Sequence, residues 1–179
     1  MKKLTILCSL VFLVVFASAC KNEKSLQSYL VEANEKAEFS SFDVPVSSVL
    51  SPKADVSDDV KETIKSIKKI NVVFLKKTEE NETVYETEKA TLKNLFKDNK
   101  DYKTLSSMKM KGMNVNLYYS GETDSIDEIV AFGYSQELGV GVARLLGENM
   151  NPTKIMEVVS DMNMDLDNLG GLSAIFKGK

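Results

Sequence analysis

The sequence predicts a two-layer α+β sandwich, in which a mainly antiparallel sheet of about five strands has helices packed on one face. Three observations predict this fold. Apolar patterns of helical period come first along the chain, and a nearly continuous apolar run (70–75, INVVFL) follows the second of them. A series of strand-like segments then extends from residue 105 to residue 146. Strands that follow one another after helices are typical of an α+β fold.

The first 19 residues have the three-part layout of a secretory signal peptide. Met1-Lys2-Lys3 is basic, Leu4–Phe16 is an apolar run of 13 residues, and Ala17-Ser18-Ala19 is a small-residue tripeptide. The apolar run is shorter than the about 20 residues that cross a bilayer. We therefore predict that residues 1–19 are removed, and we exclude them from the fold.

Cys20 directly follows this tripeptide, and two interpretations of the junction are open. An ordinary signal peptidase would cleave after the A-x-A pattern and release a soluble protein. The stretch ASAC also resembles the lipobox of bacterial lipoproteins, although Ala17 stands where the lipobox prefers leucine. Cys8 leaves with the leader, so Cys20 has no disulfide partner in its own chain. We therefore predict that Cys20 is acylated and becomes the new N-terminus.

A lipidated Cys20 predicts a membrane partner and a cell-envelope location. Each buried CH₂ group contributes about 0.8 kcal/mol, so two or three acyl chains hold a protein firmly at a bilayer. Residues 20–24 would be the lipidated tether of a single α+β domain that spans residues 25–179. The predicted location is the outer membrane, with the domain on its periplasmic or its surface face.

The composition of the mature chain, residues 20–179, suits one domain with a hydrophobic core. Losing Lys2 and Lys3 lowers Lys+Arg from 23 to 21 against 26 Asp+Glu, so the net charge changes from −3 to −5. The basic residues are not grouped with aromatic ones, and this pattern argues against a nucleic-acid partner.

Missing residue types exclude several kinds of chemistry. The chain has no histidine and no tryptophan, and Cys20 is the one cysteine of the mature chain. Ser-His-Asp and Cys-His catalysis and the usual zinc and copper sites therefore cannot form. We predict no metal, no cofactor and no catalytic activity. An enzyme that uses carboxylates or lysine is the less favoured alternative.

The first third of the domain is predicted to hold two helices with an extended segment between them. Residues 25–38 place apolar side chains at helical spacing. The stretch 39–50 contains Pro45 and is predicted to be an edge strand or an extended loop. Ser57 can cap a helix that opens with Asp58-Asp59, since acidic residues suit the positive end of the helix dipole.

The apolar run at 70–75 is predicted to be a strand covered on both faces. A helix that starts with a Thr83-x-x-Glu86 capping box follows it. The next segments have a period of two: they are a strand at 105–110, a turn at Lys111-Gly112, a strand at 113–119, a turn at 120–124, and strands at 126–134 and 138–146. Asn151-Pro152 then starts a helix. The apolar tail 166–176 is predicted to dock as a short helix.

The stretch GVGVARLLG (139–147) resembles a glycine-rich phosphate loop but departs from its pattern. The pattern G-x-G-x-x-G requires glycine at the position that Arg144 occupies. Read as a strand, this stretch has a face of small residues made of Gly139, Gly141, Ala143 and Leu145. We predict that this face lets a helix approach the sheet closely.

The stretch DMNMDLD (161–167) resembles the start of a calcium-binding loop. An EF-hand then needs glycine at the sixth place and glutamate at the twelfth, and these places hold Leu166 and Leu172. We predict that the apolar residues between the acids are core contacts at a helix end and that no calcium binds.

Arg144 is the only arginine, and it shares a strand face with Val140, Val142 and Leu146. Such an arginine pairs with a carboxylate or lies at a sheet edge with its stem packed. We predict an internal salt bridge. The alternative is that Arg144 recognises a carboxylate or phosphate of a ligand.

Tyr118, Asn114 and Asn116 are predicted to line the open face of their strand. Together with Arg144 they are candidate contacts for a ligand or a partner, since tyrosine offers an apolar body and a polar tip. A solvated sheet face is the simpler alternative. The neighbouring carboxylates Asp127-Glu128 point to opposite faces of a strand, so they cannot act jointly in acid-base catalysis.

The whole layout resembles the bacterial domain-of-unknown-function family numbered 4252. The resemblance covers nearly all of residues 25–165 in addition to the leader that ends in Cys20. Its further features are the VVFL strand, the VNLYYSG hairpin, the DEIVAFG strand and the helix NPTKIMEVV. The resemblance implies a small exported lipoprotein of bacteria with two membranes, linked to sigma-factor regulators and envelope stress signalling. It implies no activity and no functional residues.

These observations favour a lipid-anchored binding or interaction module of the cell envelope, with an envelope protein as its partner. A structural envelope lipoprotein without a discrete ligand is the alternative. A carboxylate- or lysine-based enzyme is the least favoured hypothesis.

Overall fold

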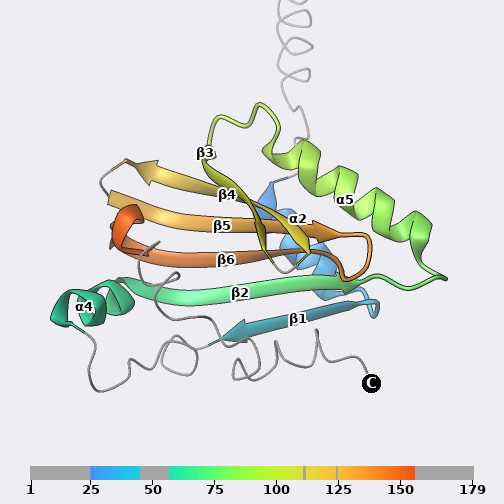
Figure 1. Ribbon diagram of the computed structural model, residues 1–179, viewed down its shortest axis with the longest axis horizontal. Coiled ribbons are helices and arrows are strands. Elements are labelled where there is room, and N and C mark those ends of the chain that lie inside the picture. Colours follow the sequence, from blue (N-terminus) through green and yellow to red (C-terminus); the bar gives the residue numbers. More distant parts are fainter. Residues whose placement is uncertain (1–24, 45–56, 111, 124, 156–179) are drawn as a thin grey trace, which may run out of the picture.

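The computed structural model describes residues 25–44, 57–110, 112–123 and 125–155 (Figure 1). Its labelled helices are α2 (Leu26–Asn34), α4 (Asp58–Ser66) and α5 (Glu82–Phe96). Its strands are β1 (Phe39–Val44), β2 (Ile67–Lys76), β3 (Lys103–Met110), β4 (Met113–Glu122), β5 (Ser125–Ser135) and β6 (Gly139–Met150). The α+β class and the order of helices and strands agree with the sequence-based prediction.

The strands form one six-stranded antiparallel sheet in the order β1-β2-β6-β5-β4-β3. The sequence predicts about five strands, and the additional one is β1, which pairs with β2 from Phe39 opposite Leu75 to Val44 opposite Ile70. Strands β3 to β6 are successive antiparallel neighbours, and β6 returns to lie between β5 and β2. Strand β2 has a neighbouring strand on each side, and side chains on both of its faces are buried. This burial agrees with its nearly continuous apolar sequence.

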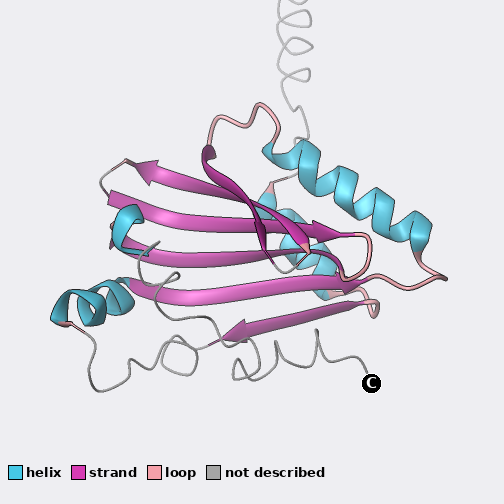
Figure 2. Cartoon of the chain, in the orientation of Figure 1, coloured by secondary structure: helices cyan, strands magenta, loops and turns pink. Residues whose placement is uncertain are grey.

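Helices α2 and α5 pack on one face of the sheet, which we call the helix face (Figure 2). The sheet side chains of this core are Val73, Leu75, Val130, Phe132, Val140 and Val142. The helices add Leu26, Tyr29, Leu30, Ala33, Tyr85, Leu92, Leu95 and Phe96. Burying one side chain the size of Leu or Phe contributes about 1.5–3 kcal/mol, so this core holds the two layers together.

A second core lies on the other face, at one end of the sheet next to α4 (Figure 1). Its buried members are Ile64, Ile67, Ile70, Val72, Ile126, Ile129, Met150 and Ile155. Ile70 and Val72 point away from the helix face because side chains alternate along β2. Pro152 starts a further helix, as the sequence predicts, and the Asn151 side chain accepts a hydrogen bond from the backbone N–H of Lys154 at 3.1 Å.

In the described part of the chain, the two glycines of the small-residue face of β6 meet an aromatic ring of β2, while Ala143 and Leu145 farther along this face pack against the core next to α4. Gly139 and Gly141 lie under the ring of Phe74 on β2, so the aromatic side chain of the neighbouring strand fills the space. A Cβ atom built on Gly141 would lie 2.4 Å from the Val73 carbonyl oxygen and 2.8 Å from Phe74 Cδ2. Because Gly139 and Gly141 have no side chain, β6 can pair closely with β2 and leave room for the ring of Phe74.

The predicted capping box at Thr83 is wrong, because α5 begins earlier, at Glu82, with Asn81 as its N-cap residue. The Asn81 side chain makes no capping hydrogen bond. It binds the preceding turn instead, where its amide nitrogen donates to the Lys76 carbonyl at 2.7 Å and its oxygen accepts from the Thr78 N–H at 2.8 Å. Asn81 thus fixes the connection from β2 to α5.

Several expectations lie outside the described residues: the leader 1–19, Cys20 with the tether 20–24, the calcium-like stretch 161–167 and the apolar tail 166–176. Among the residues that the structure describes, no helix has both the length and the apolar character needed to cross a bilayer.

Candidate functional site

Arg144 forms a bidentate ion pair with Glu128 on the neighbouring strand, which confirms the predicted internal salt bridge. Its Nε donates to Glu128 Oε1 at 2.7 Å, and its Nη2 donates to Glu128 Oε2 at 3.0 Å. The side chains of Arg144 and Glu128 are only 15% and 10% exposed. A pair held this closely away from water is strong once formed, but removing one partner leaves a buried charge without compensation.

Two further residues complete the polar cluster around this ion pair. Arg144 Nη1 donates to Gln27 Oε1 on α2 at 2.6 Å, and the Tyr102 hydroxyl donates to Glu128 Oε1 at 3.0 Å. Burial raises the pKa of Tyr102, and the negative charge of Glu128 raises it further. We call Gln27, Arg144, Glu128 and Tyr102 the polar clamp. It joins the first turn of α2 to β6, to β5 and to the residue before β3.

The polar clamp favours the internal interpretation of Arg144. Three of its five guanidinium N–H groups are bonded within the fold, two of them to the carboxylate of Glu128 and one to the amide oxygen of Gln27. An arginine that recognises a ligand must offer donors to it. The geometry of Arg144 is that of a structural clamp between a helix and the sheet.

Tyr118 lies on the helix face and packs under α5, so the expectation of an open face is wrong for this residue. Its ring stacks on Phe96 with centroids 4.3 Å apart and an angle of 7° between the planes. It pairs in register with Val130 of the main core. Burial raises the pKa of Tyr118, as expected for a phenol removed from water.

Asn114 and Asn116 point to the same face of β4 as Tyr118, because side chains two residues apart share a face. The Asn116 side-chain oxygen accepts a hydrogen bond from the Ser107 hydroxyl on β3 at 2.8 Å. Asn114 lies opposite Lys109 on β3 and opposite Tyr134 on β5. The four candidate contacts therefore share one face, but Arg144 and Tyr118 are committed to its interior contacts.

The carboxylates lie as the sequence predicts. Asp127 is exposed and Glu128 is buried, and β5 has a β-bulge at this point, where its register shifts against both β4 and β6. Asp58 and Asp59 begin α4, and Asp59 accepts from Lys154 Nζ at 2.6 Å. Within the described parts of the chain, no three His, Cys, Asp or Glu side chains are grouped so that they could hold a metal ion.

A second ion pair, which sequence reasoning missed, joins the turn after α2 to a buried glutamate of α5. Lys36 Nζ lies 2.6 Å from Glu88 Oε1, and the Glu88 side chain is only 7% exposed. Burial raises the pKa of Tyr29, and the carboxylate of Glu88 raises it further. The signal was present in the sequence, since Glu88 falls between Tyr85 and Leu92 in the buried stripe of α5.

A shallow depression of about 560 Å³ lies where the turn between β5 and β6 meets the start of α5. It is lined by Lys77, Thr78, Glu79, Glu82, Gln136 and Glu137. Lys77 forms an ion pair with Glu82, and Gln136 donates to Glu86 at 3.1 Å. The depression is thus an open surface whose one lysine is paired with a glutamate of the same lining, which is not the enclosed, convergent geometry of an active site.

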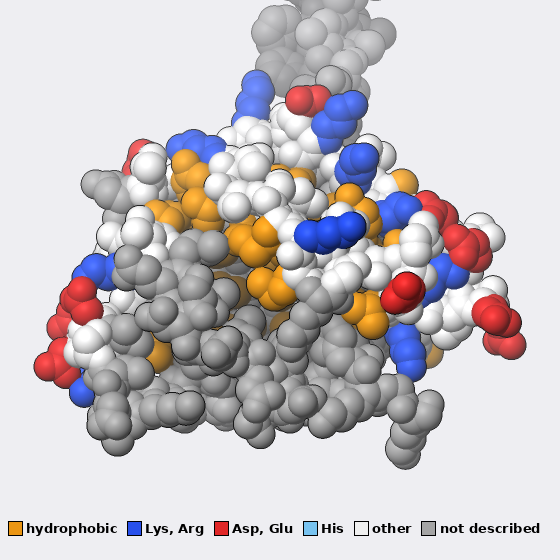
Figure 3. Space-filling view, in the orientation of Figure 1, with side chains coloured by type: hydrophobic (Ala, Val, Ile, Leu, Met, Phe, Trp, Pro, Cys, Tyr) orange, Lys and Arg blue, Asp and Glu red, His pale blue; other side chains and the backbone are white. Residues whose placement is uncertain are grey.

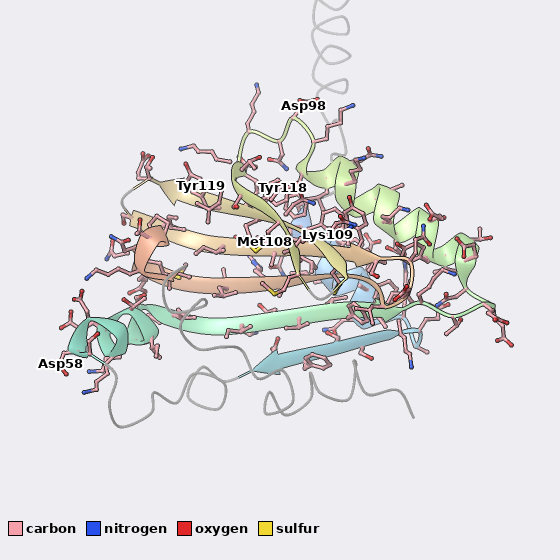
Figure 4. All side chains as sticks on the ribbon, viewed as in Figure 1. Asp58, Asp98, Met108, Lys109, Tyr118 and Tyr119 are labelled. Atoms are coloured by element: carbon pink, nitrogen blue, oxygen red, sulfur yellow. The ribbon has the colours of Figure 1, made fainter. Side chains whose placement is uncertain are left out.

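Exposed lysines gather along the end of α5, the following loop and β3, on one edge of the sheet. We call this set the basic edge; its members are Lys93, Lys97, Lys100, Lys103 and Lys109. In the parts of the chain that the structure describes, none of them forms an ion pair, whereas Lys36, Lys61, Lys68, Lys69, Lys77, Lys89 and Lys154 do. Residues 93–109 contain two acidic side chains, Asp98 and Asp101, so this stretch carries a net charge of +3 in an acidic protein. Figure 4 labels Asp98 in the loop after α5 and Lys109 on β3.

The face of the sheet opposite α2 is apolar along β3 and β4. Figure 3 shows hydrophobic side chains gathered on this face. Alternation and register place Met108, Met113, Val115, Leu117 and Tyr119 there, all partly exposed. Lys103 borders this face, with its Nζ 5.6 Å from the centre of the Tyr119 ring and 3.5 Å from the Gly121 carbonyl oxygen.

The fold and these surfaces define a small α+β domain in which the buried Glu88 and Glu128 are paired with cations and one sheet edge carries exposed lysines. The chain belongs to the family described as Domain of unknown function (DUF4252), whose model matches residues 29–158. This match confirms the family resemblance, and it covers every labelled strand of the sheet. The searches of curated proteins and of solved structures returned no match.

Proposed function

We propose that this protein is a lipid-anchored binding or interaction module of the cell envelope. The observation that carries the proposal is the layout of the first 26 residues: a basic start, an apolar run, Ala17-Ser18-Ala19 and then Cys20, with the fold beginning at Leu26. Ser25 caps α2 by accepting a hydrogen bond from the Ser28 N–H at 3.1 Å. The anchor and the folded domain are thus separated by a few residues only.

Acylation of Cys20 would proceed in two steps. A thioether bond forms between Cys20 Sγ and a diacylglycerol group from a glycerophospholipid, whose phosphate headgroup leaves with the thiol proton. Water then cleaves the peptide bond between Ala19 and Cys20, and the freed amine becomes available for a further acyl chain. The product is a domain that is held at a bilayer by acyl chains.

The interior of the domain supports a binding role over a catalytic one. Among the described residues, two carboxylates are buried, Glu88 and Glu128, and each forms an ion pair with a cation of the same fold. A catalytic carboxylate needs access to a substrate and a pKa matched to its task. These two carboxylates are therefore better suited to a structural role, and the exposed surfaces of the domain are its candidate contacts with a partner.

The intact mass of the mature protein, extracted from its native membrane, tests the anchor. We expect the mass of residues 20–179 plus a diacylglycerol group and one further acyl chain. The bare mass of residues 20–179 would overturn the lipid anchor. A Cys20→Ser variant is the matched control, since it retains the leader but lacks the acceptor sulfur.

Cross-linking in intact cells, followed by purification of the protein, tests the interaction role. We expect a reproducible envelope protein to be recovered with the anchored chain. Recovery of the anchored chain alone, at cross-linking levels that capture a known envelope complex, would favour the structural-lipoprotein alternative.

A further inference from the structure

The point at which the chain enters the fold lies beside the basic edge. Gln27 in the first turn of α2 binds Arg144, Arg144 binds Glu128, and Glu128 accepts from Tyr102. Tyr102 directly precedes Lys103, where β3 begins. The polar clamp therefore holds the N-terminal end of the domain next to the loop that carries Lys97 and Lys100.

The length of chain before α2 limits how far this end of the domain can lie from an anchor at Cys20. Residues 20–24 are five residues, and each extended residue spans at most about 3.3–3.6 Å, so their reach is roughly 17 Å. This step rests on the proposed acylation of Cys20. A tether this short keeps the basic edge within reach of the membrane surface.

We propose that the basic edge is the membrane-facing surface of the tethered domain and that it binds the phosphate headgroups of anionic lipids. Its five lysines are exposed, and none is paired with a carboxylate in the described residues. Asp98 and Asp101 offset two of these charges. A lysine near an anionic bilayer raises membrane partitioning by about fivefold, and clusters of four or more act together.

The arrangement favours a membrane over an acidic protein as the partner. The lysine ammonium groups are spread along a helix end, a loop and an edge strand. They can bind a layer of phosphate groups without the shape complementarity that a protein partner requires. The borders of the surface also suit a headgroup layer, since Tyr119 lies under Lys103 and Met110 at the far end of β3 is 41% exposed. The anchored chain would then lie edge-on at the bilayer, with its sheet roughly upright.

The test uses residues 20–179 carrying Cys20→Ser, so that no lipid anchor contributes to binding. Sedimentation is measured with vesicles of phosphatidylglycerol and phosphatidylcholine and with vesicles of phosphatidylcholine alone. We expect binding to the anionic vesicles that weakens with salt, and little binding to the neutral ones. Because this chain cannot be acylated, the result is independent of whether Cys20 is lipidated in the cell.

Paired variants assign the binding to the basic edge. The double variant Lys100→Gln with Lys103→Gln should lower partitioning onto anionic vesicles roughly 25-fold. The matched control is Lys65→Gln with Lys76→Gln, which removes two exposed lysines from other surfaces and should leave partitioning nearly unchanged. Circular dichroism establishes that both variants are folded.

Three outcomes would overturn the proposal: equal binding to both kinds of vesicle, an equal loss in the control pair, or no binding to anionic vesicles at low salt. Binding of an acidic polypeptide such as polyglutamate, without binding to vesicles, would assign the basic edge to a protein partner instead.

Discussion

The carboxylate of Glu128 accepts two hydrogen bonds from the guanidinium of Arg144. The two residues lie on adjacent antiparallel strands, beneath the first turn of α2. This single relationship connects the helix layer to the sheet, since Gln27 binds the same guanidinium. It also gives the only arginine of the chain an internal partner, as the sequence predicts.

Replacing Glu128 tests this support. Glu128→Gln keeps the size of the side chain but leaves the Arg144 charge uncompensated, so we expect the free energy of unfolding to fall by about 3–5 kcal/mol. Urea denaturation measures the change. Asp127→Asn is the matched control, because it removes an exposed carboxylate from the neighbouring position of β5 and should change stability by less than about 0.5 kcal/mol. Equal losses in the two variants would contradict the assigned role.

Replacing Tyr118 tests its place under α5. Tyr118→Phe keeps the ring that stacks on Phe96 and should leave the urea midpoint nearly unchanged. Tyr118→Leu keeps apolar volume but removes the aromatic pair, which contributes about 0.5–1.5 kcal/mol beyond area burial. A residue on a solvated sheet face would instead tolerate both changes equally.

The buried tyrosines predict a loss of stability at alkaline pH. Burial raises the pKa of Tyr29, Tyr102 and Tyr118 above the reference value of 10.0. The unfolded chain therefore releases these protons at about pH 10 while the folded chain still holds them. Their contribution to stability is complete below about pH 10 and is lost as the pH rises above it.

Urea midpoints measured at increasing pH, from neutral to beyond pH 10, test this prediction. We expect a decline that begins near pH 10, with the tyrosinate absorbance appearing mainly on unfolding. Titration of Tyr29, Tyr102 and Tyr118 at their ordinary pKa in the folded protein would contradict it.

Adding a methyl group at Gly141 tests the close pairing of β6 with β2. In Gly141→Ala the new Cβ would overlap the Val73 carbonyl oxygen, a backbone atom that cannot rotate away. We expect a loss of more than about 3 kcal/mol or a failure to fold. Gly112→Ala is the comparison, since nothing lies within 4 Å of its Cβ position, although its φ of +80° makes the change mildly unfavourable. Thermal denaturation of the two variants gives the ranking.

The sequence predicts the local features of this protein well because periodicity and capping act over a few residues. Period-two alternation locates the last four strands, and Asn151-Pro152 locates the last helix start. Glu88 could have been identified in the same way, as a charge within an apolar stripe. The β-bulge at Asp127 is not visible in the alternation of the sequence, although the contrast between an exposed Asp127 and a buried Glu128 agrees with it.

Long-range pairing explains the expectations that were wrong. Alternation along β4 shows that Tyr118 and Leu117 face opposite sides, but it does not show which side α5 covers. The apolar residues Met113, Val115 and Leu117 made the other side appear to be the core. At Gly139 and Gly141 the neighbouring Phe74 fills the space, which the small-residue pattern of β6 does not reveal.

By itself, the sequence determined the family, the α+β class, the order of helices and strands and the chemistry that the chain lacks, because these depend on composition and on local spacing. Only the tertiary structure decided that β6 lies between β2 and β5, that Glu128 and not Asp127 meets Arg144, and that Gln27 at the start of α2 binds Arg144 on β6. The physical reason is that these relationships join residues far apart in the chain, and the packing of both faces of the sheet selects among pairings that local patterns permit equally.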